Sequence, residues 1–415
     1  MPRPHAVRLL CICTAALLSG AAPALAAEAP VFGLAALRQM ALDANKSLEA
    51  ARDVVDVARA SVVTAGAYPN PETELTFGNA SPRVGGASGN AHAIALSQRI
   101  DNPWQRRARI GAAEAAVGGA EAGLRSARVT LLARLQTAFY DLLRRQEELG
   151  AARDDLALAE SIYDKIKVRV DVGEAPRFDL IRAEAERLNA RNATRSAELR
   201  VKQARLAIRA LVAERLPADF EVRGDWSTAR ALEPLEAVRE RLLDSNPELA
   251  ALRAEQSRFE RQVELEKARR MPEVAIRAVQ ERDPDLDNSR VGVLLTIPIW
   301  DRRAGPIAEA TAQGLRARNQ LEHSQFVLTQ SLETAYGQYE IARNQISALE
   351  GAILREAEAA LKVAEAAYRF GERGILEVLD ARRVFRAARN DLIAARFELE
   401  VARIEIERLQ AVETP

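Results

Sequence analysis

The chain has few of the side chains on which enzymes and metal sites depend. Its 415 residues include two cysteines, Cys11 and Cys13, and three histidines, His5, His92 and His323. The histidines are far apart, and no cysteine occurs after the first segment, so we predict no metal site, no disulfide and no cofactor. The scattered acidic pairs are typical of solvated helix faces rather than of an acid–base dyad. An enzyme is therefore the least favoured class.

Net charge and aromatic content are also low. The chain carries 59 basic and 59 acidic residues, which gives no electrostatic reason to expect a nucleic-acid partner. Aromatic residues make up only 5% of the chain, whereas alanine and leucine are abundant. This composition favours long, closely packed helices over a bulky globular core.

Beyond residue 26 there is no apolar run of the roughly 18 residues that a membrane helix needs. Residues 1–26 combine Arg3 and Arg8 with a short apolar run and the small-residue sequence AAPALA. This pattern predicts a signal peptide that is cleaved before Ala27, with a disordered tail as the alternative. Both cysteines lie too early to become a lipid-modified first residue. We therefore expect an exported, unlipidated protein whose membrane residence, if any, comes from strands.

Four motifs occur twice in the same order. LDANKSLEAAR starts at Leu42 and LDSNPELAALR at Leu243, 201 residues apart, and two Pro-Glu pairs keep that spacing. The other matches are IALSQRIDNPWQRRARIGAAEA with LLTIPIWDRRAGPIAEA, and GEAPRFDLI with GERGILEVL. Two unrelated helical halves of similar composition would not keep such spacing. We predict an internal duplication, with repeats over 27–213 and 234–410, a linker over 214–233 and a tail over 411–415.

Each repeat is expected to contain a helix, a strand pair and a long helical hairpin. The first helices are expected at 34–65 and 235–269, the latter interrupted at Pro247. Strand pairs are expected within 72–100 and 273–299, with individual strands at 72–79, 91–100, 273–281 and 290–299. Long helices are expected at 104–172, 178–212, 307–370 and 376–409.

Glycine-containing segments interrupt the long helical patterns at equivalent places. Almost 70 residues precede each interruption, which corresponds to roughly 100 Å of helix. We therefore expect two hairpin tips, near residues 173 and 371, where glycine allows the chain to turn. One continuous helix with tolerated glycines is the alternative, and Pro176 argues against it.

The strands are about as long as a tilted membrane strand and alternate in polarity. Four strands cannot close a barrel, and open edges are not tolerated in lipid. We therefore expect a mainly α-helical protein with a membrane β-barrel that closes only when copies of the chain associate; three copies would give a 12-stranded barrel with a water-filled interior. Tyr68, Trp104 and Trp300 fall at the strand ends that face the helices, where an interfacial aromatic belt would lie. Packing at the strand–helix junction is the alternative role for these three residues.

Together these motifs resemble the TolC-type outer-membrane efflux family over essentially the whole mature chain. The resemblance rests on LDANKSLEAAR and LDSNPELAALR, on IPIWDRRAGPIAEA and above all on YRFGERGILEVLDA. The first-half junction, LSQRID followed by RRARI, most resembles the heavy-metal, CzcC-like branch.

The resemblance implies a homotrimer in the outer membrane of a Gram-negative bacterium, with a periplasmic helical tunnel. It also implies a periplasmic adaptor and an inner-membrane pump, of the resistance-nodulation-division type, that deliver substrate to a passive exit duct. Heavy-metal cations are the first expectation for the substrate. Drugs, small organic molecules or type I secreted proteins are the alternatives.

The family closes its tunnel near the tips of the second hairpins. The matching positions here are Tyr368, Arg373, Glu377 and Asp380, with Asp179 as the acidic partner of the arginine. In a trimer each acid would occur three times about a narrow axis and form a constriction that favours cations. Arg373 could bridge to a carboxylate on the next hairpin and hold the gate shut. Ordinary solvated helix charges are the alternative.

The tips also resemble the family's adaptor-docking motif, a valine–glycine–leucine grouping. The corresponding residues are Val172, Gly173, Glu174, Phe370, Gly371 and Glu372. Glutamate replaces leucine in both tips, which departs from the family pattern. An adaptor or a soluble coiled-coil scaffold would also have long helices. An adaptor needs a lipoyl-like β domain, which this sequence does not show, and it would not have duplicated strand pairs.

Overall fold

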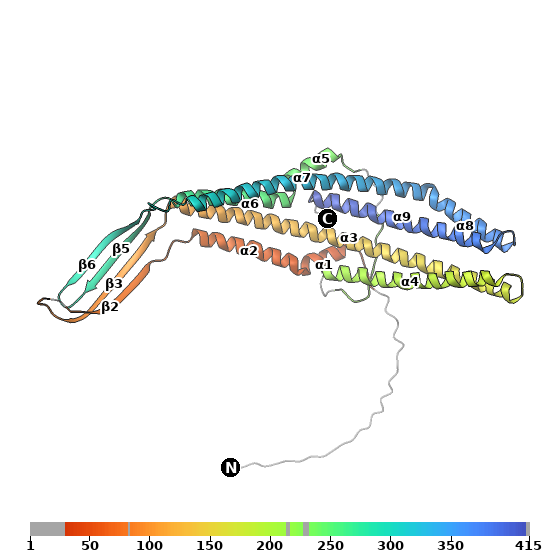
Figure 1. The fold of residues 1–415 in the computed structure, drawn as a ribbon, viewed down its shortest axis with the longest axis horizontal. Helices are drawn as coiled ribbons and strands as arrows, with labels where there is room; N and C mark the ends of the chain where they lie inside the picture. The colour runs from red at the N-terminus through yellow and green to blue at the C-terminus, as the bar shows by residue number, and fades with distance from the viewer. Residues whose placement is uncertain (1–29, 82–83, 213–215, 227–231, 412–415) are drawn as a thin grey trace, which may run out of the picture.

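The computed structural model describes residues 30–81, 84–212, 216–226 and 232–411. The predicted signal peptide, both cysteines, part of the predicted linker and all but the first residue of the predicted tail lie outside these residues. The described chain is elongated, with a four-stranded sheet at one end and two helical hairpin tips at the other (Figure 1). None of its helices combines the length and apolarity needed to cross a bilayer.

The first predicted helix is in fact two helices, α1 (Leu34–Ala44) and α2 (Lys46–Gly66). The chain breaks at Asn45, whose side-chain oxygen accepts hydrogen bonds from the backbone N–H groups of Ser47 and Leu48 at 3.0 and 3.2 Å. Its Nδ2 also donates to the carbonyl of Leu211 at 2.8 Å. The prediction of one continuous helix was wrong because asparagine stabilises a new helix start here.

The second half breaks at the equivalent place, between α5 (Leu235–Ser245) and α6 (Pro247–Ala268), where Pro247 predicted an interruption. Asn246 caps α6 through the N–H groups of Glu248 and Leu249, and its Nδ2 donates to the carbonyl of Leu409 at 2.9 Å. The repeated asparagine therefore makes the same set of hydrogen bonds in both halves.

The repeated arginine of the same motif also has matching partners. Arg52 donates to the carbonyl of Leu42, and Arg253 donates to the carbonyls of Leu243 and Asp244. These carbonyls lie near the ends of α1 and α5, where helical carbonyls lack partners within the helix. The motif therefore closes the end of one helix and starts the next.

The four long strands form one antiparallel sheet in the order β2-β3-β5-β6. They are β2 (Glu72–Ala80), β3 (Gly89–Ile100), β5 (Glu273–Arg282) and β6 (Asp287–Thr296). β6 lies three residues earlier than predicted. A tight turn joins it to β5, with the N–H of Asp283 bonded to the carbonyl of Leu286 at 2.9 Å, and Pro298 has no N–H to extend the ladder.

The helical part consists mainly of two long hairpins that run side by side (Figure 1). The first joins α3 (Pro103–Asp171) to α4 (Arg177–Val212). The second consists of α7 (Ala304–Ala348), a π-helical turn (Leu349–Ile353), α8 (Leu354–Arg369) and α9 (Ile375–Leu409). The π turn was not predicted. It places Leu349 in an apolar cluster with Leu392 and Ala395 of α9.

The Arg-rich motifs tie the strand–helix junctions together. In the first half Arg106 and Arg109 donate to the carbonyls of Gly66 and Ala65 at the end of α2, at 2.8 and 2.6 Å. In the second half Arg303 pairs with the buried Glu266 near the end of α6. Each arginine motif therefore fixes the start of a long helix to the helix before the strands.

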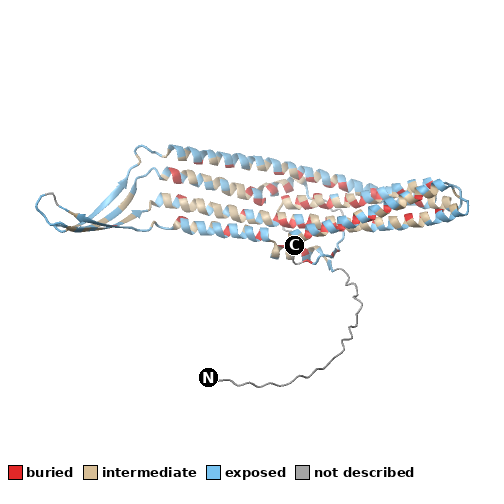
Figure 2. Ribbon diagram, turned by 60° about the horizontal axis from the view of Figure 1, so that its bottom comes forward, coloured by how far each residue is buried: buried red, intermediate tan, exposed pale blue. Residues whose placement is uncertain are grey.

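The buried residues are concentrated in the helical part, whereas the sheet is largely exposed (Figure 2). One apolar cluster joins α1, α3 and α4 to the short parallel pair β1 (Val31–Phe32) and β4 (Glu221–Val222). A second cluster joins α5, α6, α7 and α9. Both clusters lie near the middle of the elongated chain. Apolar packing therefore stabilises the helical part, whereas no other layer covers the sheet.

Candidate functional site

Both hairpin tips end their first helix with the same hydrogen-bond pattern. In the first tip the N–H of Glu174 bonds to the carbonyl of Arg169 at 2.7 Å, and that of Gly173 to Val170 at 3.1 Å. In the second tip Glu372 and Gly371 bond to Ala367 and Tyr368 at 2.9 and 3.1 Å. This is the Schellman arrangement, in which the residue after the cap adopts a left-handed conformation.

Glycine is required at one position in each tip. Gly173 has φ 82° and Gly371 has φ 77°, a region that side chains disfavour. No atom lies within 4 Å of a Cβ built at either glycine, so the requirement comes from the backbone rather than from crowding. Gly374 has an ordinary φ of −80° and starts α9. The two glycines of the GERG sequence therefore have different roles: Gly371 makes the left-handed turn, and Gly374 precedes the first residue of α9.

The predicted docking residues form an exposed surface. Phe370 is 80% exposed and Val172 is 64% exposed. Glu174 and Glu372 are also exposed beside the two glycines. The neighbouring Phe178 and Leu376 are likewise more than half exposed. Exposed apolar groups at both tips, next to glutamates, make a surface suited to contact with another protein.

The predicted gate charges are paired within α9 or next to it. Arg373 donates to Glu377 at 3.0 Å, four residues further along the chain, and Arg383 pairs with Asp380. All four side chains are exposed, and such pairs are worth about 0–1 kcal/mol. Among the described residues Arg373 therefore contacts Glu377 rather than Asp179.

The other two predicted gate residues lie closer to the body of the hairpins. Tyr368 is partly buried against an apolar cluster of both hairpins, and the guanidinium of Arg169 lies 5.3 Å from the centre of its ring. Asp179 is in the first turn of α4, and its backbone N–H bonds to the carbonyl of Pro176 at 3.0 Å. The structure does not bring Tyr368, Arg373 and Asp179 together into one bonded group within a chain.

A further ion pair lies on α4 of the first hairpin, near its tip. Arg187 donates two hydrogen bonds to Glu184, at 2.8 and 2.9 Å, and these bonds lower the pKa of that carboxyl. The same guanidinium lies 4.6 Å from the ring centre of Tyr163 on α3. The ion pair lies within α4 and holds the guanidinium of Arg187 charged, and the contact of that guanidinium with Tyr163 links α4 to α3.

The two faces of the sheet differ in polarity. The strand registers put large apolar side chains on one face, and nearly all of them are exposed. These side chains are Leu75, Phe77, Ile94, Leu96, Ile100, Ile276, Val291, Val293 and Leu295. The other face carries mainly small, polar and charged residues, with Val279 and Leu294 as the apolar exceptions, and it includes the pairs Arg277–Glu74 at 2.7 Å and Arg290–Glu281 at 2.6 Å. One face therefore suits lipid and the other suits water.

The predicted interfacial aromatics lie where the sheet meets the helices. Tyr68 precedes β2, Trp104 is at the start of α3, and Trp300 follows β6. They are 69%, 65% and 93% exposed, respectively. Tyr68 also stacks under the guanidinium of Arg106 at 4.7 Å. Their exposure fits a role at a boundary better than packing inside the chain.

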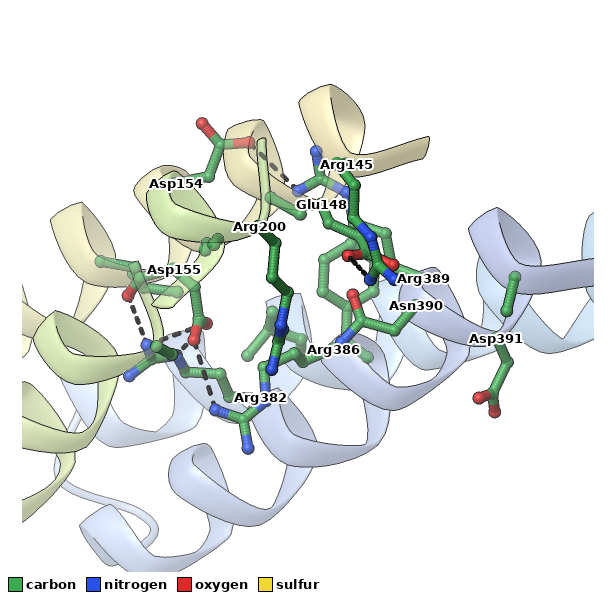
Figure 3. A pocket seen from close by; sticks show the side chains of 18 residues that line it. Arg145, Glu148, Asp154, Asp155, Arg200, Arg382, Arg386, Arg389, Asn390 and Asp391 are labelled. Carbon is green, nitrogen blue, oxygen red and sulfur yellow. Dashed lines mark hydrogen bonds and ion pairs between the residues drawn. The ribbon is translucent and has the colours of Figure 1, made fainter. Parts of the chain in front are cut away.

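Sequence reasoning missed a cluster of charges between the two hairpins (Figure 3). Arg382, Arg386 and Arg389 of α9 pair with Asp154 and Asp155 of α3. The cluster lines a pocket of about 630 Å³ between α3, α4 and α9. The spacing of the arginines is visible in the sequence, but their partners are more than 220 residues away. The described residues contain no group of three or more potential metal ligands.

Comparisons with known proteins agree with this geometry. A family model described as outer membrane efflux protein matches residues 37–214 and 238–411. The cobalt-zinc-cadmium resistance protein CzcC of Cupriavidus metallidurans is 27% identical, over 86% of this chain and 84% of that protein. The nickel-cobalt-cadmium resistance protein NccC of Alcaligenes xylosoxydans is 26% identical, over 75% of this chain and 71% of that protein.

Solved structures show the same fold. The structure of CusC, from work on conformational changes during folding and transmembrane channel formation, aligns with a TM-score of 0.80. It is 19% identical and the alignment covers 91% of each chain. The match of the family model to most of both halves identifies this chain as a member of the outer membrane efflux protein family, the TolC-type family that its sequence motifs resemble.

Proposed function

We propose that three copies of this chain form an outer-membrane channel, and that the channel is the exit duct of a three-part efflux system. The observation that carries the proposal is the four-stranded sheet, which has one exposed apolar face and two outer edges. A soluble protein would not leave such a face uncovered. Lipid would cover the apolar face, and neighbouring copies would cover the edges.

The strand order supports closure by copies of the chain. β2 and β6 are the outer strands, so β6 of one copy can pair with β2 of the next. Three copies give 12 strands, a number that leaves a water-filled interior. The small and charged face would line this interior, and Tyr68, Trp104 and Trp300 would lie at the membrane boundary nearest the helices.

We infer that the two repeats, 27–213 and 234–410, arose by duplication of one unit. The matched hydrogen bonds of Asn45 and Asn246 and the matched glycines of the two tips support this inference. Each repeat supplies one strand pair and one hairpin. The helical part then extends the barrel as a periplasmic tunnel, because α3 alone has 69 residues, roughly 100 Å of helix.

The tips are the proposed gate and docking surface. Glu377 and Asp380 would each occur three times around the tunnel axis and favour cations. Arg373 pairs weakly with Glu377 in the single chain, so it remains available to Asp179 of a neighbouring hairpin in the closed trimer. Val172, Phe370 and the glutamates beside them would meet a periplasmic adaptor.

Heavy-metal cations are the proposed substrates, delivered by an inner-membrane pump of the resistance-nodulation-division type. The metal-resistance relatives CzcC and NccC support this substrate class, together with the acidic residues of the proposed gate. The chain would act as a passive duct, with selection made by the pump and the adaptor. The outer membrane of a Gram-negative bacterium is the proposed location.

The proposal is tested by conductance of the purified protein in planar bilayers. We expect discrete channels that prefer cations and whose conductance rises in Arg373→Ser, because Glu377 loses its partner and the closed tips loosen. Arg355→Ser, which removes another exposed pair, on α8, is the matched control and should leave conductance unchanged. A protein that inserts but never conducts would contradict the proposal.

A further inference from the structure

The charge cluster between the hairpins has a single centre, Asp155 of α3 (Figure 3). Arg382 donates from Nε to its carboxylate at 2.8 Å and from Nη2 to its backbone carbonyl. Arg386 reaches the other carboxylate oxygen at 3.4 Å. Arg389, one turn further along α9, pairs with Asp154 at 3.1 Å. Two helices from different hairpins are thus joined by four hydrogen bonds.

The ion pairs of this cluster differ in how far they are buried. The side chains of Arg382 and Asp155 are 6% and 13% exposed, whereas that of Asp154 is 70% exposed. Removing one partner of a buried pair strongly destabilises the structure, because the other charge is left buried without compensation. An exposed pair contributes little. The Arg382–Asp155 pair therefore dominates the connection.

The charge cluster does not have the composition of an anion-binding site. Its pocket is lined by five arginines and four carboxylates, so its charges nearly balance. One nitrogen of Arg382, Nη1, is buried without a hydrogen-bond partner among the described residues. Because that atom is closed off from solvent, it is not presented to a diffusing ligand. The cluster therefore joins two helices rather than binding an anionic ligand.

Between the Arg382–Asp155 pair and the tip, the same side of α9 packs against the first hairpin through apolar side chains. Ile375 and Val378 are buried in a cluster with Ile162 and Ile166 of α3 and Ala183 of α4. With Arg382 they recur at spacings of three and four residues, which places them on one face of α9. The first two turns of α9 are therefore held against the first hairpin by apolar packing and then by the charged pair.

The proposed gate acids lie away from this face of α9. Glu377 and Asp380 are exposed, and the helical period places Asp380 roughly half a turn, and Glu377 roughly a third of a turn, from the face of Val378 and Arg382. Asp380 is only two residues before Arg382. Any rotation or outward movement of this part of α9 would therefore move both acids and would break the buried pair.

We propose that Arg382 and Asp155 form a clasp that fixes the rotation of α9 on α3 and so aims Glu377 and Asp380 at the tunnel axis. Arg382 is a positioning residue and does not itself contact the substrate. This proposal rests on the proposed channel function. It adds a contact within each copy of the chain, between the tips and the sheet, that holds the channel closed. Opening then requires α9 to leave Asp155.

The adjacent aspartates provide a matched test. Asp155→Asn removes the buried partner and Asp154→Asn removes the exposed one, with the same change of charge and shape. In planar bilayers we expect Asp155→Asn to raise the ratio of open to closed channels by about tenfold or more, the scale set by loss of a buried partner. Its cation preference should fall because the gate acids no longer face the axis. Asp154→Asn should match the unmodified channel in both respects.

A milder variant and a second measurement keep the test independent of folding and of conduction. Arg382→Lys keeps the charge but cannot hold carboxylate and carbonyl together, so an intermediate effect is expected. Hydrogen exchange in detergent should show faster exchange over residues 375–392 in Asp155→Asn than in Asp154→Asn, with α7 unchanged. Equal exchange and equal gating in the two variants would overturn the clasp. If the unmodified protein failed to conduct, the channel proposal would fail, and the exchange comparison would still decide the clasp.

Discussion

Replacing Asn246 tests whether the repeated asparagine motif stabilises the helical part of the chain. The side chain is 3% exposed and makes three hydrogen bonds, two to the start of α6 and one to the last turn of α9. Asn246→Ala removes the cap, which costs about 1 kcal/mol. It also leaves the carbonyl of the buried Leu409 without this partner, which costs a further ~1–2 kcal/mol. We therefore expect a loss of about 2–3 kcal/mol.

A second substitution separates the two contributions. Serine is an effective cap but is too short to reach the carbonyl of Leu409, so Asn246→Ser should retain about 1 kcal/mol that Asn246→Ala loses. Asn45→Ala should cost less than Asn246→Ala, because Asn45 is only partly buried and water can replace its bonds. Ser245→Ala removes one exposed bond to the carbonyl of Arg241 and should change stability by no more than about 0.5 kcal/mol.

The assay is urea unfolding of the detergent-solubilised protein, followed by the helical circular dichroism signal. The order of stability expected is the unmodified protein, then Ser245→Ala close to it, then Asn246→Ser, then Asn246→Ala. Equal losses in the serine and alanine variants would show that the cap contributes nothing. A change in Asn246→Ala no larger than that in Ser245→Ala would refute the assignment of the motif.

Two other predictions use neighbouring positions as controls. Gly371→Ala should destabilise the protein by about 1 kcal/mol, because the left-handed conformation costs ~1–2 kcal/mol and the entropy gain offsets part of it, whereas Gly374→Ala should be nearly neutral in the same unfolding assay. Ile94→Arg puts a charge on the apolar face of β3 and should cost about 2–4 kcal/mol in lipid, while Ala93→Arg on the opposite face should insert normally. The fraction of protein folded into vesicles, read from heat-modifiable migration on gels, measures that difference. Equal losses for the two members of either pair would contradict the reasoning.

Most of the fold could be predicted from two local signals in the sequence, the spacing of apolar residues and the glycines at turns. The long helices, the strand pairs and the positive φ of Gly173 and Gly371 follow from local rules, since each depends on neighbouring residues. The break at Asn45 was missed because asparagine within a helical pattern is ambiguous. Its decisive partner, Leu211, lies 166 residues away.

The candidate site was only partly accessible from the sequence. The tip residues could be found because the GEAPRF and GERGIL segments recur and resemble a known family. The clasp could not, because Asp155 and Arg382 are 227 residues apart and each looks like an ordinary solvated charge on its own helix. Only the packing of α9 on α3 shows that this pair is buried. The sheet order β2-β3-β5-β6 likewise depends on pairing between the two halves.

The central claim is that copies of the chain close one barrel through the outer strands β2 and β6. No cysteine occurs in the sequence after Cys13, so new cysteines can report on this contact alone. Within one chain β2 and β6 are three strand spacings apart, roughly 14 Å, which is too far for a disulfide. Any bridge between them must therefore join two chains.

The measurement places one cysteine at Thr76 in β2 and a second at Gly292 in β6, with the neighbouring β6 positions scanned to find the register. After oxidation of the membrane-embedded protein, we expect a non-reducing gel to show dimers and trimers and nothing larger. A chain that stays monomeric at every register, or a ladder that continues beyond three copies, would contradict the trimeric barrel.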